Sequence, residues 1–251
     1  SGWGDRCFMK LEEPITRHEW FAKSVHLNAD GADLTADWIM PPNPLGIVLF
    51  AHGSGSSRHS SRNKAVARQL VERGIGTFLL DLLTLGEEQI DAVTRHLRFN
   101  IPFLGKRLVE ATRWISDQYE ARGLSLGYFG ASTGSAAALV AAAGMKHSIS
   151  AVVSRGGRPD LAGRALSLVT APTLLLVGGN DTEVEQLNRQ AMTQMRCEKK
   201  LVIIPGATHL FEEPGTLDLV AVDAADWFAD HFNHHGNPGL KPSVALKKGG
   251  L

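Results

Sequence analysis

Cysteine is scarce in this 251-residue chain, which contains only Cys7 and Cys197. Two cysteines this far apart in the sequence match neither a disulfide framework nor the closely spaced ligands of a zinc site. We therefore expect two reduced thiols. Neither cysteine stands at a junction between an expected strand and an expected helix, so the sequence offers no candidate for a thiol nucleophile.

An excess of charge of one sign is also lacking, because 26 Lys and Arg balance 26 Asp and Glu. Proteins that coat nucleic acid or an anionic membrane concentrate basic residues, and the one basic run here is 241–248. No apolar run approaches the ~20 residues of a membrane span, and no signal peptide is visible. We expect a cytoplasmic protein without a nucleic-acid or membrane partner, although Ser1 in place of Met leaves the native N-terminus open.

The composition is otherwise that of an average globular protein, with 43% hydrophobic and 21% charged residues. One α/β domain commonly occupies about 250 residues, enough to bury a sizeable core. We therefore expect a single domain over residues 20–235. An N-terminal segment, 1–19, precedes it, and a tail rich in glycine and proline, 236–251, follows it and is expected to be flexible.

The hydrophobic pattern predicts a β-hairpin around Asp30 and Gly31 and then an alternation of strands and helices. Strands are expected at 47–51, 76–83, 124–129, 149–154, 173–177 and 200–204, and helices at 63–73, 105–119, 133–144, 183–195 and 217–232. Strands that are apolar on both faces and separated by helices are typical of a parallel sheet. The expected fold is an α/β fold with eight strands, mostly parallel, and helices on both faces.

The stretch 126–134 contains the motif that points to a chemistry. Gly130, Ser132 and Gly134 form a G-x-S-x-G pattern between an expected strand and an expected helix. In this context the chain turns so sharply that the serine is held in a strained conformation and its neighbours must be small. A Gly/Ser turn without chemistry is the alternative. Ser132 is the candidate nucleophile.

A serine nucleophile needs a base to take its proton and an acid to orient that base. In this architecture the acid and then the histidine follow the serine along the chain, each in a loop after a strand. Asp181 follows the strand 173–177, and His209 follows the strand 200–204. The sequence therefore predicts a triad of Ser132, His209 and Asp181.

Each partner also has a simpler explanation. Asp181 could cap the helix 183–195, which is a common role for aspartate, and His209 could be an ordinary loop histidine. Asp160 and His52 also lie near strand ends and are rivals for the acid and the base. They fit the expected order and position less well.

Acyl transfer also needs hydrogen-bond donors for the oxyanion of the transition state. The expected donors are the backbone N–H of Thr133, directly after the nucleophile, and the N–H of Ser54 in the loop 52–57. A phosphate cradle is the alternative for this loop, but no G-K-[ST] follows it. No G-x-G-x-x-G opens a helix either. We expect no cofactor and no metal.

The segments 50–56, 127–138 and 205–211 carry a likeness to a known family. Over residues 46–232 the chain resembles the α/β-hydrolases, and within them the dienelactone-hydrolase-like branch. The segment 154–160 is similar to a subgroup often found with phosphoribosyltransferase proteins, although no pyrophosphate-binding motif of those enzymes is present.

The resemblance implies a hydrolase, with one departure from the pattern. The enzymes that give the branch its name use cysteine as the nucleophile, whereas this chain has Ser132. This difference puts the dienelactone substrate in doubt and favours a serine esterase.

Two segments bear on the substrate. The short interval 155–172 leaves little room for a cap, which predicts an open site. We expect the loop 84–102 to form a pocket wall, unless its apolar residues anchor the following helix instead. The expected lining residues are Leu97, Phe99, Ile101, Pro102 and Phe103.

Arg155 and Arg158 lie at the carboxyl end of a strand, the edge where ligands bind in open α/β sheets. An arginine there, Arg155 above all, could bind a substrate carboxylate or phosphate through two hydrogen bonds. Pairing with Asp160, or simple solvation, is the alternative.

The sequence thus predicts a serine esterase that acts on small or short-chain carboxylic esters of small molecules. An acyltransferase, a thioesterase or an amidase would use the same triad. A non-catalytic ligand-binding module on this fold is the alternative from another class. The sequence determines neither the natural ester, nor stereoselectivity, nor oligomeric state.

Overall fold

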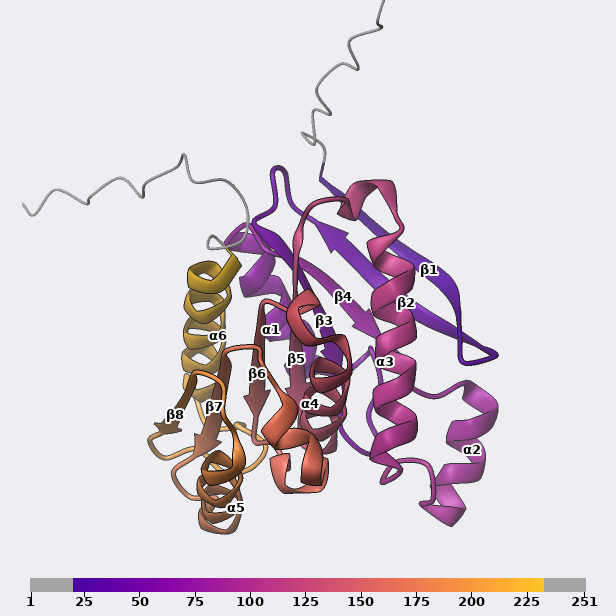
Figure 1. Cartoon of the computed structure of the whole chain (residues 1–251). Helices are drawn as coiled ribbons and strands as arrows, with labels where there is room; N and C mark the ends of the chain where they lie inside the picture. Colours follow the sequence, from indigo (N-terminus) through magenta and orange to yellow (C-terminus); the bar gives the residue numbers. More distant parts are fainter. Residues whose placement is uncertain (1–19, 233–251) are drawn as a thin grey trace, which may run out of the picture.

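The computed structural model describes residues 20–232 (Figure 1). The expected N-terminal segment 1–19 and tail 236–251 lie outside the described residues, as does Cys7. Within the described range, no helix combines the length and the apolar character needed to cross a membrane.

An eight-stranded sheet forms the centre of the molecule, in the order β1-β2-β4-β3-β5-β6-β7-β8. The first two strands form the expected antiparallel hairpin, β2 pairs with β4 in antiparallel fashion, and all other pairs are parallel. This confirms the predicted fold class. The strands are β1 Phe21–Ala29, β2 Ala32–Met40, β3 Gly46–Ala51, β4 Gly76–Leu80, β5 Ser125–Ala131, β6 Ala151–Arg155, β7 Thr173–Gly178 and β8 Lys199–Ile204.

The order of the strands determines where along the sheet a ligand-binding crevice can form. From β3 the chain moves to β4 on one side, and then returns to β5 on the other side of β3. The loops that follow β3 and β5 therefore leave in opposite directions. A crevice opens at such a reversal, outside the carboxyl ends of the strands, and this is where ligands bind in α/β sheets.

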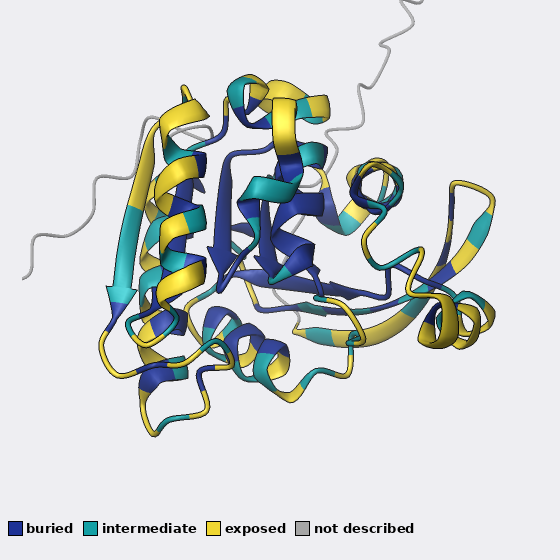
Figure 2. Ribbon diagram, turned by 90° about the horizontal axis from the view of Figure 1, so that it is seen from below, coloured by how far each residue is buried: buried dark blue, intermediate teal, exposed yellow. Residues whose placement is uncertain are grey.

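Helices cover both faces of the sheet (Figures 1 and 2). Helices α1 and α6 pack together on one face, while α3, α4, α5 and the 3-10 segment η3 cover the other. The helical segments are α1 Ser61–Glu72, α2 Leu85–Thr94, α3 Ile101–Ser116, η1 Tyr119–Ala121, α4 Thr133–Met145, η2 Lys146–Ser148, η3 Pro159–Leu168, α5 Thr182–Gln194 and α6 Thr216–Phe232.

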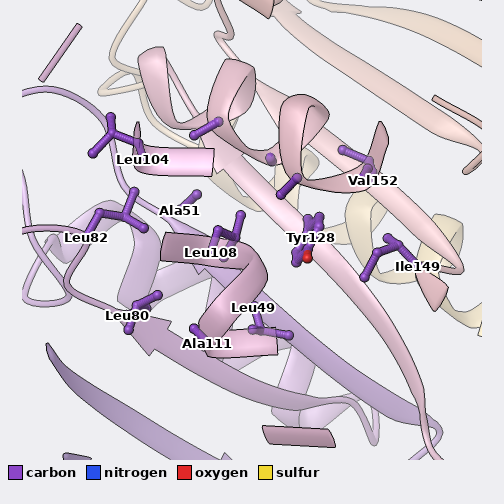
Figure 3. Packing of buried hydrophobic residues seen from close by; sticks show 14 of the residues in the cluster. Leu49, Ala51, Leu80, Leu82, Leu104, Leu108, Ala111, Tyr128, Ile149 and Val152 are labelled. Carbon is purple, nitrogen blue, oxygen red and sulfur yellow. The ribbon is translucent and has the colours of Figure 1, made fainter. Parts of the chain in front are cut away.

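Alternation along the strands divides the core into two layers. Leu49 and Tyr128 belong to the layer under α3 and α4 (Figure 3), whereas Phe50 and Phe129 belong to the layer under α1 and α6. Neighbouring residues of one strand point to opposite faces of a sheet. A strand covered on both sides must be apolar at every position, as β3 is, with all six residues buried.

The segment 84–102 departs from the prediction. It contains the helix α2, which was not expected, and the start of α3, which begins at Ile101 rather than at residue 105. Two caps explain the difference. Thr84 and Glu87 form a capping box at the start of α2, and the Asn100 side chain accepts the N–H of Phe103 at 3.3 Å.

Candidate active site

Ser132 occupies the sharp turn between β5 and α4. Its backbone has φ 51° and ψ −122°, a conformation that costs a residue with a side chain about 1–3 kcal/mol. The flanking glycines are required by space. A Cβ at Gly130 would overlap the backbone of Ser135, and one at Gly134 would overlap the carbonyl oxygen of Ala51. The expected nucleophile therefore lies on a strained elbow between crowded backbones.

Asp181 and His209 lie on adjacent loops at the carboxyl ends of β7 and β8. The His209 Nδ1 atom is 2.6 Å from Asp181 Oδ2. A carboxylate can only accept, so Nδ1 carries the hydrogen and Nε2 is left as the base. Asp181 precedes α5, but its side chain makes no capping hydrogen bond. The alternative that this carboxylate caps the helix is therefore wrong.

Backbone contacts hold the two loops in register. The N–H of Asn180 donates to the carbonyl of Ala207 at 2.9 Å, and the Asn180 side-chain amide donates to the carbonyl of Gly206 at 3.0 Å. Glu213, which the sequence did not single out, accepts from the Thr208 hydroxyl at 2.6 Å and from its N–H at 3.1 Å. These bonds fix the loop that presents His209.

Ser132 and His209 line the same cavity, which has a volume of about 270 Å³. Within residues 20–232 the hydrogen bond of the His209 ring goes to Asp181, and none joins His209 to the Ser132 hydroxyl. In ligand-free sites the bond between nucleophile and base is often long, and it tightens only in the complex. The His209 side chain is 38% exposed, while that of Asp181 is 14% exposed, so the base faces solvent and the carboxylate behind it is screened.

The two expected oxyanion residues meet beside the nucleophile. The Ser54 and Thr133 hydroxyl oxygens are 2.9 Å apart, and a Cβ built on Gly53 would lie 3.1 Å from the Ser132 Cβ. Thr133 is the first residue of α4, where a backbone N–H has no partner inside the helix. The loop after β3 therefore passes close to the N-terminus of α4.

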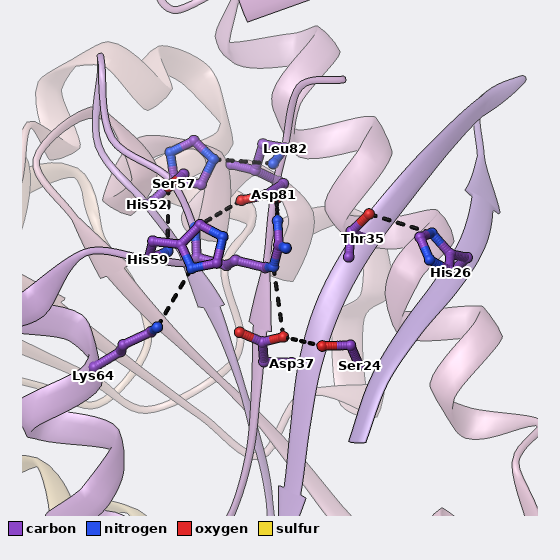
Figure 4. A network of polar contacts seen from close by, with 11 residues as sticks. Ser24, His26, Thr35, Asp37, His52, Ser57, His59, Lys64, Asp81 and Leu82 are labelled. Atoms are coloured by element: carbon purple, nitrogen blue, oxygen red, sulfur yellow. Dashed lines mark hydrogen bonds and ion pairs between the residues drawn. The ribbon is translucent and has the colours of Figure 1, made fainter. Parts of the chain in front are cut away.

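His52, a rival for the base, has a different environment. Its Nε2 accepts the N–H of Leu82 at 3.0 Å (Figure 4), and its Nδ1 is 3.0 Å from the carbonyl oxygen of Gly53. This side chain links the loop 52–57 to the segment after β4. Burial lowers the pKa of His52, which favours the neutral ring that both bonds require.

Asp160, the rival for the acid, is paired elsewhere. The Arg158 guanidinium donates to both of its carboxylate oxygens, at 2.9 and 2.7 Å. For Arg158 the alternative of pairing with Asp160 is thus confirmed. Arg155 differs, because it lines the cavity of Ser132 and His209.

A second cavity, of about 280 Å³, adjoins the first, shares Gly53, Ser54 and Ser56 with it, and is also lined by Thr133. Segment 84–102 does contribute to its wall, through Glu88, Asp91, Ala92 and Arg98. None of the five residues expected to line this wall does so. Ile101 is in the core, Leu97 and Phe103 pack against it, and Phe99 is 54% exposed. The wall comes from α2, whose existence the sequence analysis missed.

Comparison with known proteins agrees with this geometry. The sequence model of the dienelactone hydrolase family matches residues 34–234. A dienelactone hydrolase from Anabaena variabilis, known from its crystal structure, is 52% identical to this chain and has a TM-score of 0.83. The match covers 85% of this chain and 99% of that protein. Est1E from Butyrivibrio proteoclasticus shares the fold, with a TM-score of 0.70 at 18% identity, over 84% of this chain and 99% of its own.

The curated relatives are longer proteins than this chain. Two proteins of Mycobacterium tuberculosis, provisionally named phosphoribosyl transferases, are 54% identical over 200 residues. That match covers 80% of this chain but 44% of theirs, so the matched region spans less than half the length of these relatives. With the family model matched over most of its length, the chain belongs to the dienelactone hydrolase family.

Proposed function

We propose that this protein is a hydrolase that cleaves carboxylic esters of small molecules, with Ser132 as nucleophile, His209 as general base and acid, and Asp181 as the group that orients His209. The observation that supports this most is the 2.6 Å contact between His209 and Asp181, beside a strained serine that lines the same cavity as His209.

The roles follow from the chemistry of acyl transfer. Ser132 Oγ attacks the ester carbonyl carbon while His209 Nε2 takes the hydroxyl proton, and the N–H groups of Ser54 and Thr133 bind the oxyanion. Collapse of the intermediate breaks the C–O bond to the alcohol. His209 returns the proton to the leaving oxygen, and an acyl-enzyme remains. Water then attacks the acyl carbon in the same way and releases the acid and Ser132.

Two features favour hydrolysis of short-chain esters within this scheme. The half-exposed His209 is open to the water that deacylation needs. The second cavity, of about 280 Å³, is small and closed on one side by α2, so it fits a short acyl group. We also propose that the phosphoribosyl transferase name of the curated relatives refers to the part of those proteins that this chain does not cover.

A series of p-nitrophenyl esters of increasing acyl length, assayed with the wild type and with Ser132→Ala, tests this function. We expect the highest kcat/KM for acetyl to butyryl esters and a loss of roughly 1,000-fold or more in Ser132→Ala. A fluorophosphonate probe should label the wild type and not this variant. The matched control is Ser167→Ala, since Ser167 lies outside both cavities. Unchanged turnover in folded Ser132→Ala would refute the proposal.

A further inference from the structure

Arg155 is a buried cation that has no ionic partner within the described range, residues 20–232. It ends β6, its carbonyl oxygen accepts the N–H of Ser132 at 3.2 Å, and the residue is 8% exposed. Its Nη1 atom is enclosed and has no hydrogen-bond partner among residues 20–232. The Phe211 ring lies 5.9 Å from the guanidinium carbon, and a ring face stabilises a cation only weakly.

Arg62, on α1, is a second cation on the same wall. Its Nε is also enclosed without a partner, and its Nη1 reaches the exposed Glu212 at 3.3 Å. Burial, and then the charge of Arg62, lower the pKa of Arg155 to about 10. A charge as poorly solvated as that of Arg155 is costly beside a second cation, and an anion bound between the two arginines reduces that cost.

The cavity that both arginines line has no carboxylate of its own. It is shared with Ser132 and His209, and its remaining polar side chains are neutral, including the buried Asn63, whose Oδ1 also lacks a partner. The second cavity is different, because Glu88 and Asp91 belong to its wall beside Arg98. Positive charge is therefore concentrated on the side of the nucleophile that holds His209.

The position of His209 identifies which half of an ester lies on this side. The histidine must give its proton to the leaving oxygen, so the alcohol half lies in the cavity that contains His209. The acyl half then occupies the adjoining second cavity, which shares Ser54 with the first and which His209 does not line.

We propose that the alcohol half of the substrate carries a carboxylate or a phosphate group, which Arg155 and Arg62 bind, while a small acyl group occupies the second cavity. This inference rests on the proposed ester hydrolysis by Ser132. A guanidinium binds either oxyanion through two parallel hydrogen bonds, and water is largely excluded from Arg155.

A pair of esters with nearly the same leaving phenol tests the inference. We expect the wild type to have a higher kcat/KM for 4-acetoxybenzoate than for 4-acetoxybenzamide. In Arg155→Gln, kcat/KM for the anionic ester should fall by about 10- to 100-fold and for the amide much less. Comparing each variant with the wild type cancels the difference in leaving-group chemistry. Arg62→Gln should act in the same direction, and 4-acetoxyphenyl phosphate decides between carboxylate and phosphate.

Two further variants separate the binding role from a general effect. Arg68→Gln removes the same charge from α1 at an exposed position, and it should keep the wild-type preference. Arg155→Lys keeps the charge without the paired donors, and it should restore part of the preference. Circular dichroism and Tm show whether each variant is folded, and the lysine variant serves as the test if Arg155→Gln does not fold.

A binding measurement tests the inference without depending on catalytic turnover. Calorimetry on Ser132→Ala should show 4-hydroxybenzoate binding at least tenfold more tightly than 4-hydroxybenzamide, and the additional change Arg155→Gln should abolish the difference. Equal affinity, or an unchanged preference in folded Arg155→Gln, would overturn the inference while leaving Ser132 as the nucleophile. Ester turnover that survives Ser132→Ala would instead overturn the proposed function.

Discussion

At the scale of single residues, Ser132 has a strained backbone conformation. Its φ of 51° with ψ −122° is favourable only for glycine, and the backbone cannot relax because β3 and α4 crowd it through Gly130 and Gly134. The backbone strain at this position lowers the stability of the folded protein, and it places one hydroxyl at the edge of the sheet.

Replacing Ser132 with glycine should make the protein more stable and inactive. Relief of about 1–3 kcal/mol of backbone strain outweighs the roughly 0.5–1 kcal/mol of extra chain entropy that glycine loses on folding. We expect the free energy of unfolding, measured in urea, to rise by about 1 kcal/mol. Ser132→Ala keeps a Cβ on the same backbone and should show no such gain. Equal stabilities of the two variants would mean that no strain is stored here.

At the scale of elements, α2 is held by polar contacts more than by burial. Leu85, Ile90 and Val93 on this helix are exposed. The buried Arg107 donates two hydrogen bonds to Glu87, at 2.5 and 2.6 Å, and this partner lowers the pKa of Glu87. The wall of the second cavity therefore depends on a few ion pairs.

Removing the Glu87 carboxylate should loosen α2 without unfolding the sheet. Glu87→Ala leaves the guanidinium of Arg107 buried without its counter-ion and deletes the capping box. We expect amide hydrogen exchange in residues 85–97 to become at least about tenfold faster while residues 133–145 stay as protected as in the wild type. Glu110→Ala, which removes a partly exposed ion pair on α3, is the matched control. Unchanged exchange in α2 would show that other contacts hold it.

At the scale of the whole molecule, His52 links stability to pH. The buried ring joins the loop after β3 to the segment after β4 through its two nitrogens, and burial lowers its pKa below the ordinary 6.5. The unfolded chain therefore binds a proton at a pH where the folded protein does not. The stability that this group contributes is complete above about pH 6.5 and is lost as the pH falls toward its folded pKa.

We expect the free energy of unfolding to decrease as the pH falls below 6.5, with a slope of at most about 1.4 kcal/mol per pH unit from this one group. The carboxylates with lowered pKa, Glu87 and Asp91 among them, contribute at lower pH. In His52→Gln the curve should be flatter over this window. A slope equal to that of the wild type would assign the effect to other groups.

How far the sequence predicts this molecule depends on whether a signal is local. The strands and the positions of Ser132, Asp181 and His209 were predictable, because apolar periodicity and the order of loops after strands are properties of the chain itself. The capping box of α2 is also a local signal. It was not recognised, because the segment 84–102 was expected to be a loop.

Other features could not be predicted because they depend on tertiary packing. Nothing near Arg62 marks it as a site residue, and only the packing of α1 against the sheet brings it to the cavity of Ser132. The same is true of Glu213, which is linked to the loop of His209 by hydrogen bonds. The missing partner of Arg155 is likewise visible only once its surroundings are known.

The direction of the sheet has a consequence for attachment. The Ser125 hydroxyl donates to the carbonyl of Phe232 at 3.2 Å, and Phe21 pairs with Met40 at the end of the hairpin beside the start of β4. Both ends of the described chain therefore lie at the amino ends of the parallel strands, whereas the site lies at the carboxyl ends. A chain that continues from residue 20 or from residue 232 therefore leaves the folded domain on the side of the sheet opposite both cavities.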